Sequence, residues 1–471
     1  MYGTIAYGFG VVCTTIPLSM ILFVVYMVEL WYVSFLRALE KCGVIQPSLA
    51  EMTKVNGDMH ATRSLPVENR LDFLLYRIPL YYINFSLTYP RILYNLATGN
   101  TQVHPMNDEE LGRFILSGYI SRDLLSTPDG GWYWDLTSLE TMRLFEGCYC
   151  DVRGLRINAV GGVSEIILVG GNSASPGDVD WDLAKAHLQG CLLLVSKTRI
   201  HSWVHFVLPD VSAVEMQKLR RDGTLYELLY PHLRYTMRIN MVTDNGTAIT
   251  NRDNWLWYLL PWFDLPLTAT QFVGHVGKSA NQYYFGEPKK FLVSQEPRPP
   301  YVTFVGSYYE CFLDLVSDVL PFIDEDELAQ FVSGVSSILP YAQDIEPRHL
   351  LATLLHQVSV VHSCDHMVLA NGAKYMCGYI RKPFLKGGDI ESLSSCWDYL
   401  RAQVSSTWFS TDHKNPFQPL RLMDCTHNFS IDSLCCSDER FREKLRHVDQ
   451  ELSRTGLNIV SLSHFNEGLS F

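Results

Sequence analysis

Two pairs of histidines, far apart in the chain, constrain its fold more than any other feature. Each pair has three residues between its partners, as His201-Ser-Trp-Val-His205 and His362-Ser-Cys-Asp-His366. On an α-helix, residues i and i+4 point the same way, one turn apart, so each pair presents two imidazoles to one point. Two such helices packed face to face would hold one metal ion through their imidazole nitrogens, and imidazole suits iron, zinc, copper and nickel. The alternative is two pairs of ordinary histidines on amphipathic helices.

The composition predicts a large apolar core and excludes one class of partner. Of the 471 residues, 47% are hydrophobic and only 19% are charged, and the formal net charge is −12. Because binding of nucleic-acid phosphates needs a basic face, no nucleic-acid partner is expected. The 12 cysteines show no regular spacing, which is typical of buried thiols rather than of a disulfide framework.

The N-terminal stretch is uncharged and apolar. Residues Met1–Val28 carry no charged side chain, and their second half is dense in Leu, Ile, Val, Phe and Met. About 20 apolar residues cross a bilayer as a helix, and the basic Arg37 and Lys41 that follow favour the cytoplasmic side. We therefore expect residues 1–36 to form a hydrophobic helix that anchors the protein at a membrane, with residues 37–471 as one catalytic domain on the cytoplasmic side. The alternative is a buried or surface-lying helix of that domain.

Apolar spacing along the rest of the chain is mostly helical. Residues 120–175 are the exception, because they are rich in Gly, Thr and Val, and the alternation in Ser164–Val169 predicts a short sheet edge. Four prolines between residues 288 and 300 predict an extended loop over residues 284–303. The expected helices cover residues 181–207, 225–240, 308–319, 325–339, 348–369 and 437–453, and an irregular tail covers 457–471. Together these patterns predict a mainly α protein with a small β region before the first histidine pair.

The residues around the first histidine pair form a recognisable pattern. The chain reads Trp181-Asp-Leu-Ala-Lys185 before this pair and Leu228-Leu-Tyr-Pro-His-Leu-Arg-Tyr-Thr-Met-Arg-Ile-Asn240 after it. This resembles the lipoxygenases, whose pattern is W-x-L-A-K, a histidine cluster, and then L-L-x-P-H-x-R-x-T-x-x-I-N. The second histidine pair is similar to the second ligand helix of that family, and Phe471 stands where the family ends in isoleucine or valine.

The resemblance implies a large single helical catalytic domain with the activity of a non-haem iron dioxygenase, which is an oxidoreductase. Such an enzyme takes a hydrogen atom from a cis,cis-1,4-pentadiene through a metal(III)-hydroxide, adds O2 to the carbon radical and releases a hydroperoxide. The implied partners are a polyunsaturated fatty acid or related lipid, and O2. The implied cofactor is one iron per chain, with manganese as the alternative. The implied metal ligands are His201, His205, His362, His366 and the main-chain carboxylate of Phe471.

Several other residues have possible roles beside that centre. Arg381 and Lys382, beyond the second ligand helix, either meet the carboxylate of a fatty acid or are a solvated charge pair. Arg252 falls where the family has Gly or Ala beside the substrate, so its charge indicates an unusual substrate or a local shift of the alignment. His232 matches a family histidine that is not a ligand, and we interpret it as a structural group. Asp365 is either a group that orients the ligand histidines or an exposed helical residue.

The chain also departs from the family pattern. Most lipoxygenases have four residues between the first two ligands, which requires a π-type turn, whereas the three residues here suit a plain α-helix. The family's N-terminal β-sandwich has no counterpart in this sequence. These departures leave open a re-purposed lipoxygenase-like oxygenase or isomerase acting on another lipid, and a metal-free lipid-binding scaffold. A membrane fatty-acid desaturase or hydroxylase also carries H-x3-H, but it needs an H-x-x-H-H box and several spanning helices, which the sequence does not show.

Overall fold

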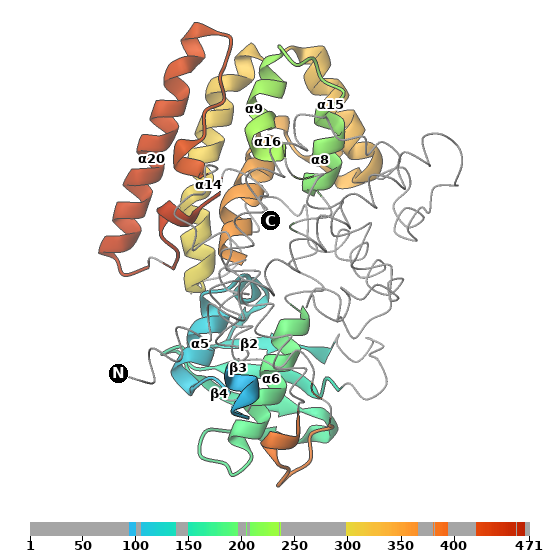
Figure 1. Cartoon of the computed structure of the whole chain (residues 1–471), viewed down its shortest axis with the longest axis vertical. Coiled ribbons are helices and arrows are strands. Elements are labelled where there is room, and N and C mark those ends of the chain that lie inside the picture. The colour runs from blue at the N-terminus through green and yellow to red at the C-terminus, as the bar shows by residue number, and fades with distance from the viewer. Residues whose placement is uncertain are drawn as a thin grey trace, which may run out of the picture.

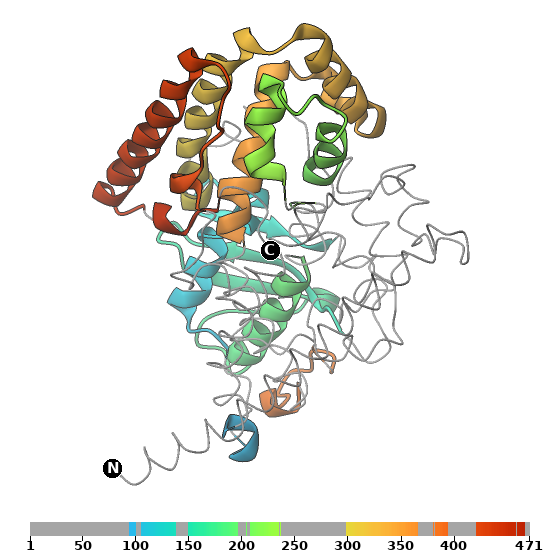
Figure 2. The same cartoon turned by 45° about the horizontal axis from the view of Figure 1, so that its top comes forward.

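The structure is a computed structural model, and it describes a helical part and a smaller part that contains a sheet (Figure 1). The described residues are 94–99, 105–137, 149–195, 204, 208–234, 236, 298–365, 380, 382–393, 421–457 and 459–466. Helices α8, α9, α14, α15, α16 and α20 gather at one end, and a small sheet with helices α5 and α6 lies at the other (Figure 1, Figure 2).

The sheet is an antiparallel meander in which each strand pairs with the next one along the chain. Side chains alternate between buried and more exposed along β2, where Trp132 and Trp134 are buried and Tyr133 between them is not, as a half-buried strand requires. The expected sheet edge at 164–169 is β4, which pairs on both sides with β3 and β5 and is therefore not an edge. The strands are β1 (Leu125–Ser126), β2 (Trp132–Asp135), β3 (Val152–Ile157), β4 (Val163–Leu168) and β5 (Ser173–Ala174).

Helix α5 (Asp108–Leu116) lies against the turn that joins β3 to β4. Asn107 caps its first turn by accepting the Glu110 backbone N–H at 2.8 Å, and the Glu110 side chain caps in return. A Cβ placed on Gly112 would come within 2.0 Å of the carbonyl oxygen of Gly161. Only glycine therefore permits this helix to approach the turn so closely.

Helix α6 (Trp181–Val195) begins with the W-x-L-A-K segment, and this segment fastens α6 to α5. The indole Nε1 of Trp181 and the Nζ atom of Lys185 each donate to the same carboxylate oxygen of Asp108, at 2.8 Å. The Lys185 side chain is only 6% exposed, whereas that of Asp108 is 45% exposed, so the pair lies at the edge of the core. The motif that carried the family resemblance thus stabilises the packing of two helices.

Helix α14 (Pro300–Val319) is the centre of the helical end and packs against both α16 and α20. Its buried residues recur every three or four positions, and they include Tyr301, Phe304, Tyr308, Phe312 and Leu315. This helix begins at Pro300, inside the segment that we expected to be a loop. Proline is favoured in a first turn, because the N–H that it lacks has no intrahelical acceptor there.

Of the other helices, α15 and α20 agree with the expected ones to within two residues, α9 and α16 begin within one residue of the expected starts, and Leu208–Met216 forms an additional helix. These helices are α8 (Leu208–Met216), α9 (Thr224–Leu233), α15 (Glu325–Ile338), α16 (Pro347–His356) and α20 (Cys435–Arg454). The prediction of a mainly α protein with a small β region is confirmed for the described ranges. The predicted hydrophobic helix over 1–36 lies outside them. Among the helices that are described, none has both the length and the apolarity needed to cross a membrane.

Candidate metal centre

The second of the two predicted ligand helices contains a π turn directly before His362. Helix α16 runs to His356, the π turn covers Gln357–Val361, and helical structure continues through Asp365. The sequence predicts a plain helix over 348–369, so this turn is a departure from the expectation. A π turn inserts one extra residue and rotates everything after it by about 100° relative to an uninterrupted helix. It therefore decides which way His362 points.

His362 and Asp365 are both buried in the helical end. The His362 side chain is fully buried, and Asp365 is 2% exposed, so the interpretation of Asp365 as an exposed helical residue is wrong. Burial raises the pKa of the Asp365 carboxyl to about 8, against an opposing effect of His362. An imidazole and a carboxyl one turn apart in the core are a polar pair that suits a cation site.

Ser363 joins this helix to the tail of the chain. Its hydroxyl donates to the carbonyl oxygen of Ser359 at 2.6 Å and accepts the backbone N–H of Asn466 at 3.0 Å. The tail is held on its other side by the backbone N–H of Leu422, which donates to the carbonyl oxygen of Phe465 at 2.9 Å. The polypeptide is thus fixed beside His362 at Asn466, five residues before Phe471.

Phe465 anchors the same tail in the core. Its ring meets the ring of Tyr308 edge-on, with centroids 5.0 Å apart, and the ring of Phe304 at 6.2 Å. Both partners belong to α14, which also packs against α16. Apolar packing and a hydrogen bond therefore hold the tail against the two helices that form this part of the core.

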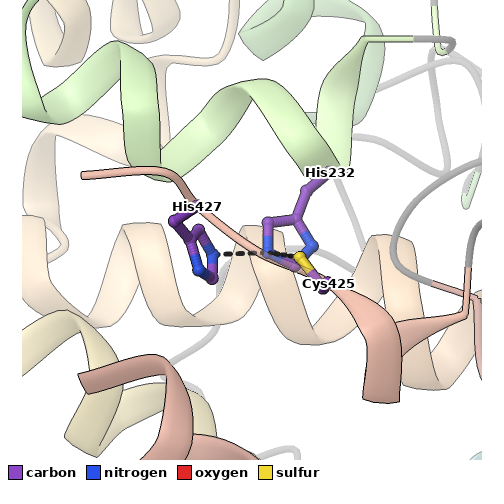
Figure 3. Close-up of side chains that lie close together, drawn as sticks. All are labelled: His232, Cys425 and His427. Carbon is purple, nitrogen blue, oxygen red and sulfur yellow. Dashed lines mark hydrogen bonds between the residues drawn. The ribbon is translucent and has the colours of Figure 1, made fainter. Parts of the chain in front are cut away.

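A second polar cluster contacts the π turn at Ser359. His232 of α9 has its Nδ1 atom 3.2 Å from the hydroxyl of Ser359 and its Nε2 atom 3.0 Å from Nε2 of His427 (Figure 3). The thiol of Cys425 lies 4.0 Å from the same His232 nitrogen. All three side chains are buried. Neither Cys425 nor His427 was predicted from the sequence to have a role, and the local signal that could have found them is their C-x-H spacing.

Of the five predicted metal ligands and the three predicted substrate contacts, two residues lie in the described ranges. His362 is buried in the ligand helix, and Lys382 is exposed. Val204, between the first two predicted ligands, is helical and fully buried. Between these two described residues, His362 and Lys382, there is no hydrogen bond or ion pair. The other predicted site residues lie outside the described ranges, and they are His201, His205, His366, Phe471, Arg381 and Arg252.

Comparison with known proteins identifies the fold. No family model matches the sequence, and no curated protein matches it. A calcium-dependent 11R-lipoxygenase of known structure superposes with a TM-score of 0.63 at 14% identity, over 78% of this chain and 66% of that chain. Coral 8R-lipoxygenase superposes with a TM-score of 0.61 at 12% identity, over 78% of this chain and 68% of that chain. A 9R-lipoxygenase from Cyanothece superposes with a TM-score of 0.56 at 12% identity, over 83% of this chain and 69% of that chain.

The chain therefore has the lipoxygenase fold, and the resemblance seen in its sequence is confirmed at this level. It matches about two thirds of the length of these proteins. The low identity makes it a divergent example of the fold.

Proposed function

We propose that this chain is a lipoxygenase-type metal dioxygenase that inserts O2 into a polyunsaturated fatty acid or a related lipid to give a hydroperoxide. The observation that carries the proposal is the ligand helix itself. His362 is fully buried directly after a π turn, and the next residue, Ser363, binds the tail that leads to Phe471. The fold of the chain and the order of its motifs support the same assignment.

The donors proposed for the metal fit iron, with manganese as the alternative. The proposed ligands are His201, His205, His362, His366 and the main-chain carboxylate of Phe471. Neutral imidazoles suit iron, and one carboxylate lowers the net charge of a cation that must stay in an apolar core. When bound there, the metal would supply the one-electron oxidation that removes a hydrogen atom from the doubly allylic carbon.

The residues of the chain would position the metal ligands and the lipid for this reaction. The π turn orients His362, and Ser363 and the ring of Phe465 hold the tail beside it. Buried apolar side chains of α14 and α16 exclude water from this part of the core. Lys382, which is exposed, suits the entrance of a lipid site, where it and Arg381 would attract the carboxylate of a fatty acid while the hydrocarbon enters the core. Arg252 is proposed as a further substrate contact.

The proposal is tested by one substitution and one matched control. His362→Ala should remove the metal and the activity together, with a loss of turnover of about 100-fold or more, because a ligand is gone. His349→Ala alters a histidine of α16 whose Nδ1 atom lies 3.1 Å from the hydroxyl of Tyr309, and it should keep both. The measurements are elemental analysis of the purified protein and the conjugated-diene absorbance after linoleate is added under air. Full metal content in His362→Ala would rule out the assignment.

We also propose that residues 1–36 bring the enzyme to a membrane, where its lipid substrate is found, with the catalytic domain on the cytoplasmic side. A variant beginning at Arg37 should be soluble and should keep its metal. If the full-length chain partitions into the soluble fraction without detergent, the anchor proposal is wrong and the dioxygenase proposal is unaffected. The lipoxygenase fold disfavours the alternative of a membrane desaturase, which needs several spanning helices.

A further inference from the structure

We propose that His232, Cys425 and His427 form a second metal site that binds a zinc ion, separate from the centre proposed at His362. The inference rests on the geometry of these three side chains and does not depend on the dioxygenase function. Figure 3 shows the two imidazoles and the thiol converging on one point from two segments of the chain. Cys425 and His232 are 193 residues apart in the sequence.

The donor atoms are close to the spacing that a tetrahedral ion requires. The Nε2 atoms of His232 and His427 are 3.0 Å apart, the Cys425 Sγ atom is 4.0 Å from the first of them, and all three donors lie within 4.8 Å of one another. Zinc bonds of about 2.0 Å to nitrogen and about 2.3 Å to sulfur would place the two nitrogens about 3.3 Å apart and each of them about 3.6 Å from the sulfur. The Cys425 thiol must therefore move toward the imidazoles and the two rings slightly apart, which rotation of these side chains can provide.

The far sides of both imidazoles are already held by the partners typical of metal-bound histidines. The Nδ1 atom of His427 lies 2.5 Å from Oδ1 of Asp438, whose other oxygen accepts the His427 backbone N–H at 3.0 Å. The Nδ1 atom of His232 lies 3.2 Å from the Ser359 hydroxyl. A ligand histidine usually binds a carboxylate or another oxygen through its second nitrogen, which fixes the ring and its tautomer. Here that arrangement aims both Nε2 atoms at the same point.

The same side chains can also form a network without a metal. In that network the Ser359 hydroxyl donates to His232, His232 donates through Nε2 to His427, and His427 donates through Nδ1 to Asp438. Binding of an ion would move the His232 proton from Nε2 to Nδ1, where it donates to Ser359. The Cys425 thiol would lose its proton to solvent, so one proton is released for each ion bound.

The donor set indicates zinc rather than a second iron. A thiolate with two imidazoles suits thiophilic ions, and a buried site with three protein donors leaves a fourth position for water. The ion would join α9 to the segment that precedes α20, which carries Asp438. It would also hold His232 against Ser359, three residues before His362. Three protein donors with an open fourth position are typical of catalytic zinc sites, but all three donors here are buried. We therefore assign the ion a structural role, in which it locks the π turn of the ligand helix between α9 and the C-terminal part of the chain.

The test uses the full chain with His362→Ala, so that metal at the first centre does not interfere. This protein should bind one zinc ion, and cobalt in its place should give a thiolate-to-cobalt absorption band. Adding Cys425→Ser should abolish the band and weaken zinc binding about 100-fold or more, and Asp438→Asn should weaken it by about 10- to 100-fold. Cys311→Ser makes the same change at another buried cysteine, in α14, and should leave both readouts as they were.

X-ray absorption of the zinc-loaded chain with Cys425 intact gives a result that does not depend on how the cysteine variant folds. One sulfur and two imidazoles around the ion would support the site. A first shell without sulfur, or a cobalt band that persists in the folded Cys425→Ser protein, would overturn the proposal. Loss of zinc binding in the Cys425→Ser protein, together with iron bound in the unmutated chain, would separate this site from the dioxygenase centre.

Discussion

Ser363 and Asn466, which are 103 residues apart in the sequence, are joined by a hydrogen bond of 3.0 Å from the backbone N–H of Asn466 to the Ser363 hydroxyl. The same hydroxyl donates to the Ser359 carbonyl oxygen at 2.6 Å, at the π turn. One buried side chain therefore couples the π turn before His362 to the tail of the chain. Both residues are almost completely inaccessible to water, so the loss of this link would not be made up by solvent.

Ser363→Ala should loosen the tail beside the ligand helix. Removing the hydroxyl leaves the Asn466 N–H buried without this acceptor, which costs about 1–3 kcal/mol of the free energy of unfolding. If the tail supplies a metal ligand, metal affinity should fall as well. Urea unfolding and elemental analysis measure the two effects.

Ser317→Ala is the matched control, because Ser317 donates to the Leu313 carbonyl oxygen at the same 2.6 Å and has no hydrogen bond to the described residues of the tail. It should leave the metal content as it was. Equal metal content in the two variants would contradict the coupling of Ser363 to the centre.

One glycine appended after Phe471 should weaken metal binding. The addition keeps every side chain but moves the terminal carboxylate by about 3.5 Å, more than the tolerance of a coordination bond. Phe471→Ile keeps the carboxylate in place and retains an apolar last residue, so it should retain the metal. Metal content is the readout, and wild-type metal in the extended chain would show that the proposed fifth ligand lies elsewhere.

The free energy of unfolding should decrease as the pH is lowered, and His356 should account for part of this decrease. Burial lowers the pKa of His356 from 6.5 to about 4, although the hydrogen bond to the Val305 carbonyl oxygen acts in the opposite direction. Between these two pH values the unfolded chain binds a proton that the folded chain excludes. The free energy of unfolding therefore decreases as the pH falls from about 6.5 to about 4, by on the order of 3 kcal/mol from this group.

His356→Gln, which keeps an N–H donor but does not titrate, should show a shallower decrease over the same pH range. The measurement is the urea midpoint at several pH values. His447→Gln, at an exposed position of α20, should follow the wild-type curve. Parallel curves for wild type and His356→Gln would contradict the assignment of a neutral buried histidine.

Gly112→Ala should separate α5 from the sheet. The added methyl group would meet backbone atoms of Gly161, at 2.0 Å from its oxygen and 3.2 Å from its carbon, and backbone cannot swing aside as a side chain can. We expect a loss of about 2–3 kcal/mol in the free energy of unfolding. Glu109→Ala adds no such contact from the exposed side of the same helix and should cost much less. A thermal unfolding comparison distinguishes the two, and equal transitions would refute the close approach.

Local patterns in the sequence determined most of the described helices and one residue of the proposed metal centre. Apolar periodicity predicted helices near α14, α15, α16 and α20, and the histidine spacing singled out His362, which is buried in the helical end. The W-x-L-A-K segment was recognised as a family pattern, and it proves to bind Asp108 of α5. These features are readable because they depend on residues a few positions apart, which a helix places on one face.

Tertiary structure decided the π turn before His362, the burial of Asp365, the link from Ser363 to Asn466 and the meeting of His232, Cys425 and His427. A periodic pattern reports that one face of a helix is covered, but not which distant segment covers it. The partners here are 103 to 195 residues apart, and only the packing of α9, α14, α16 and α20 brings them together. The π turn belongs with them, because one extra residue in a helix is stabilised by the contacts on either side of it rather than by the local sequence.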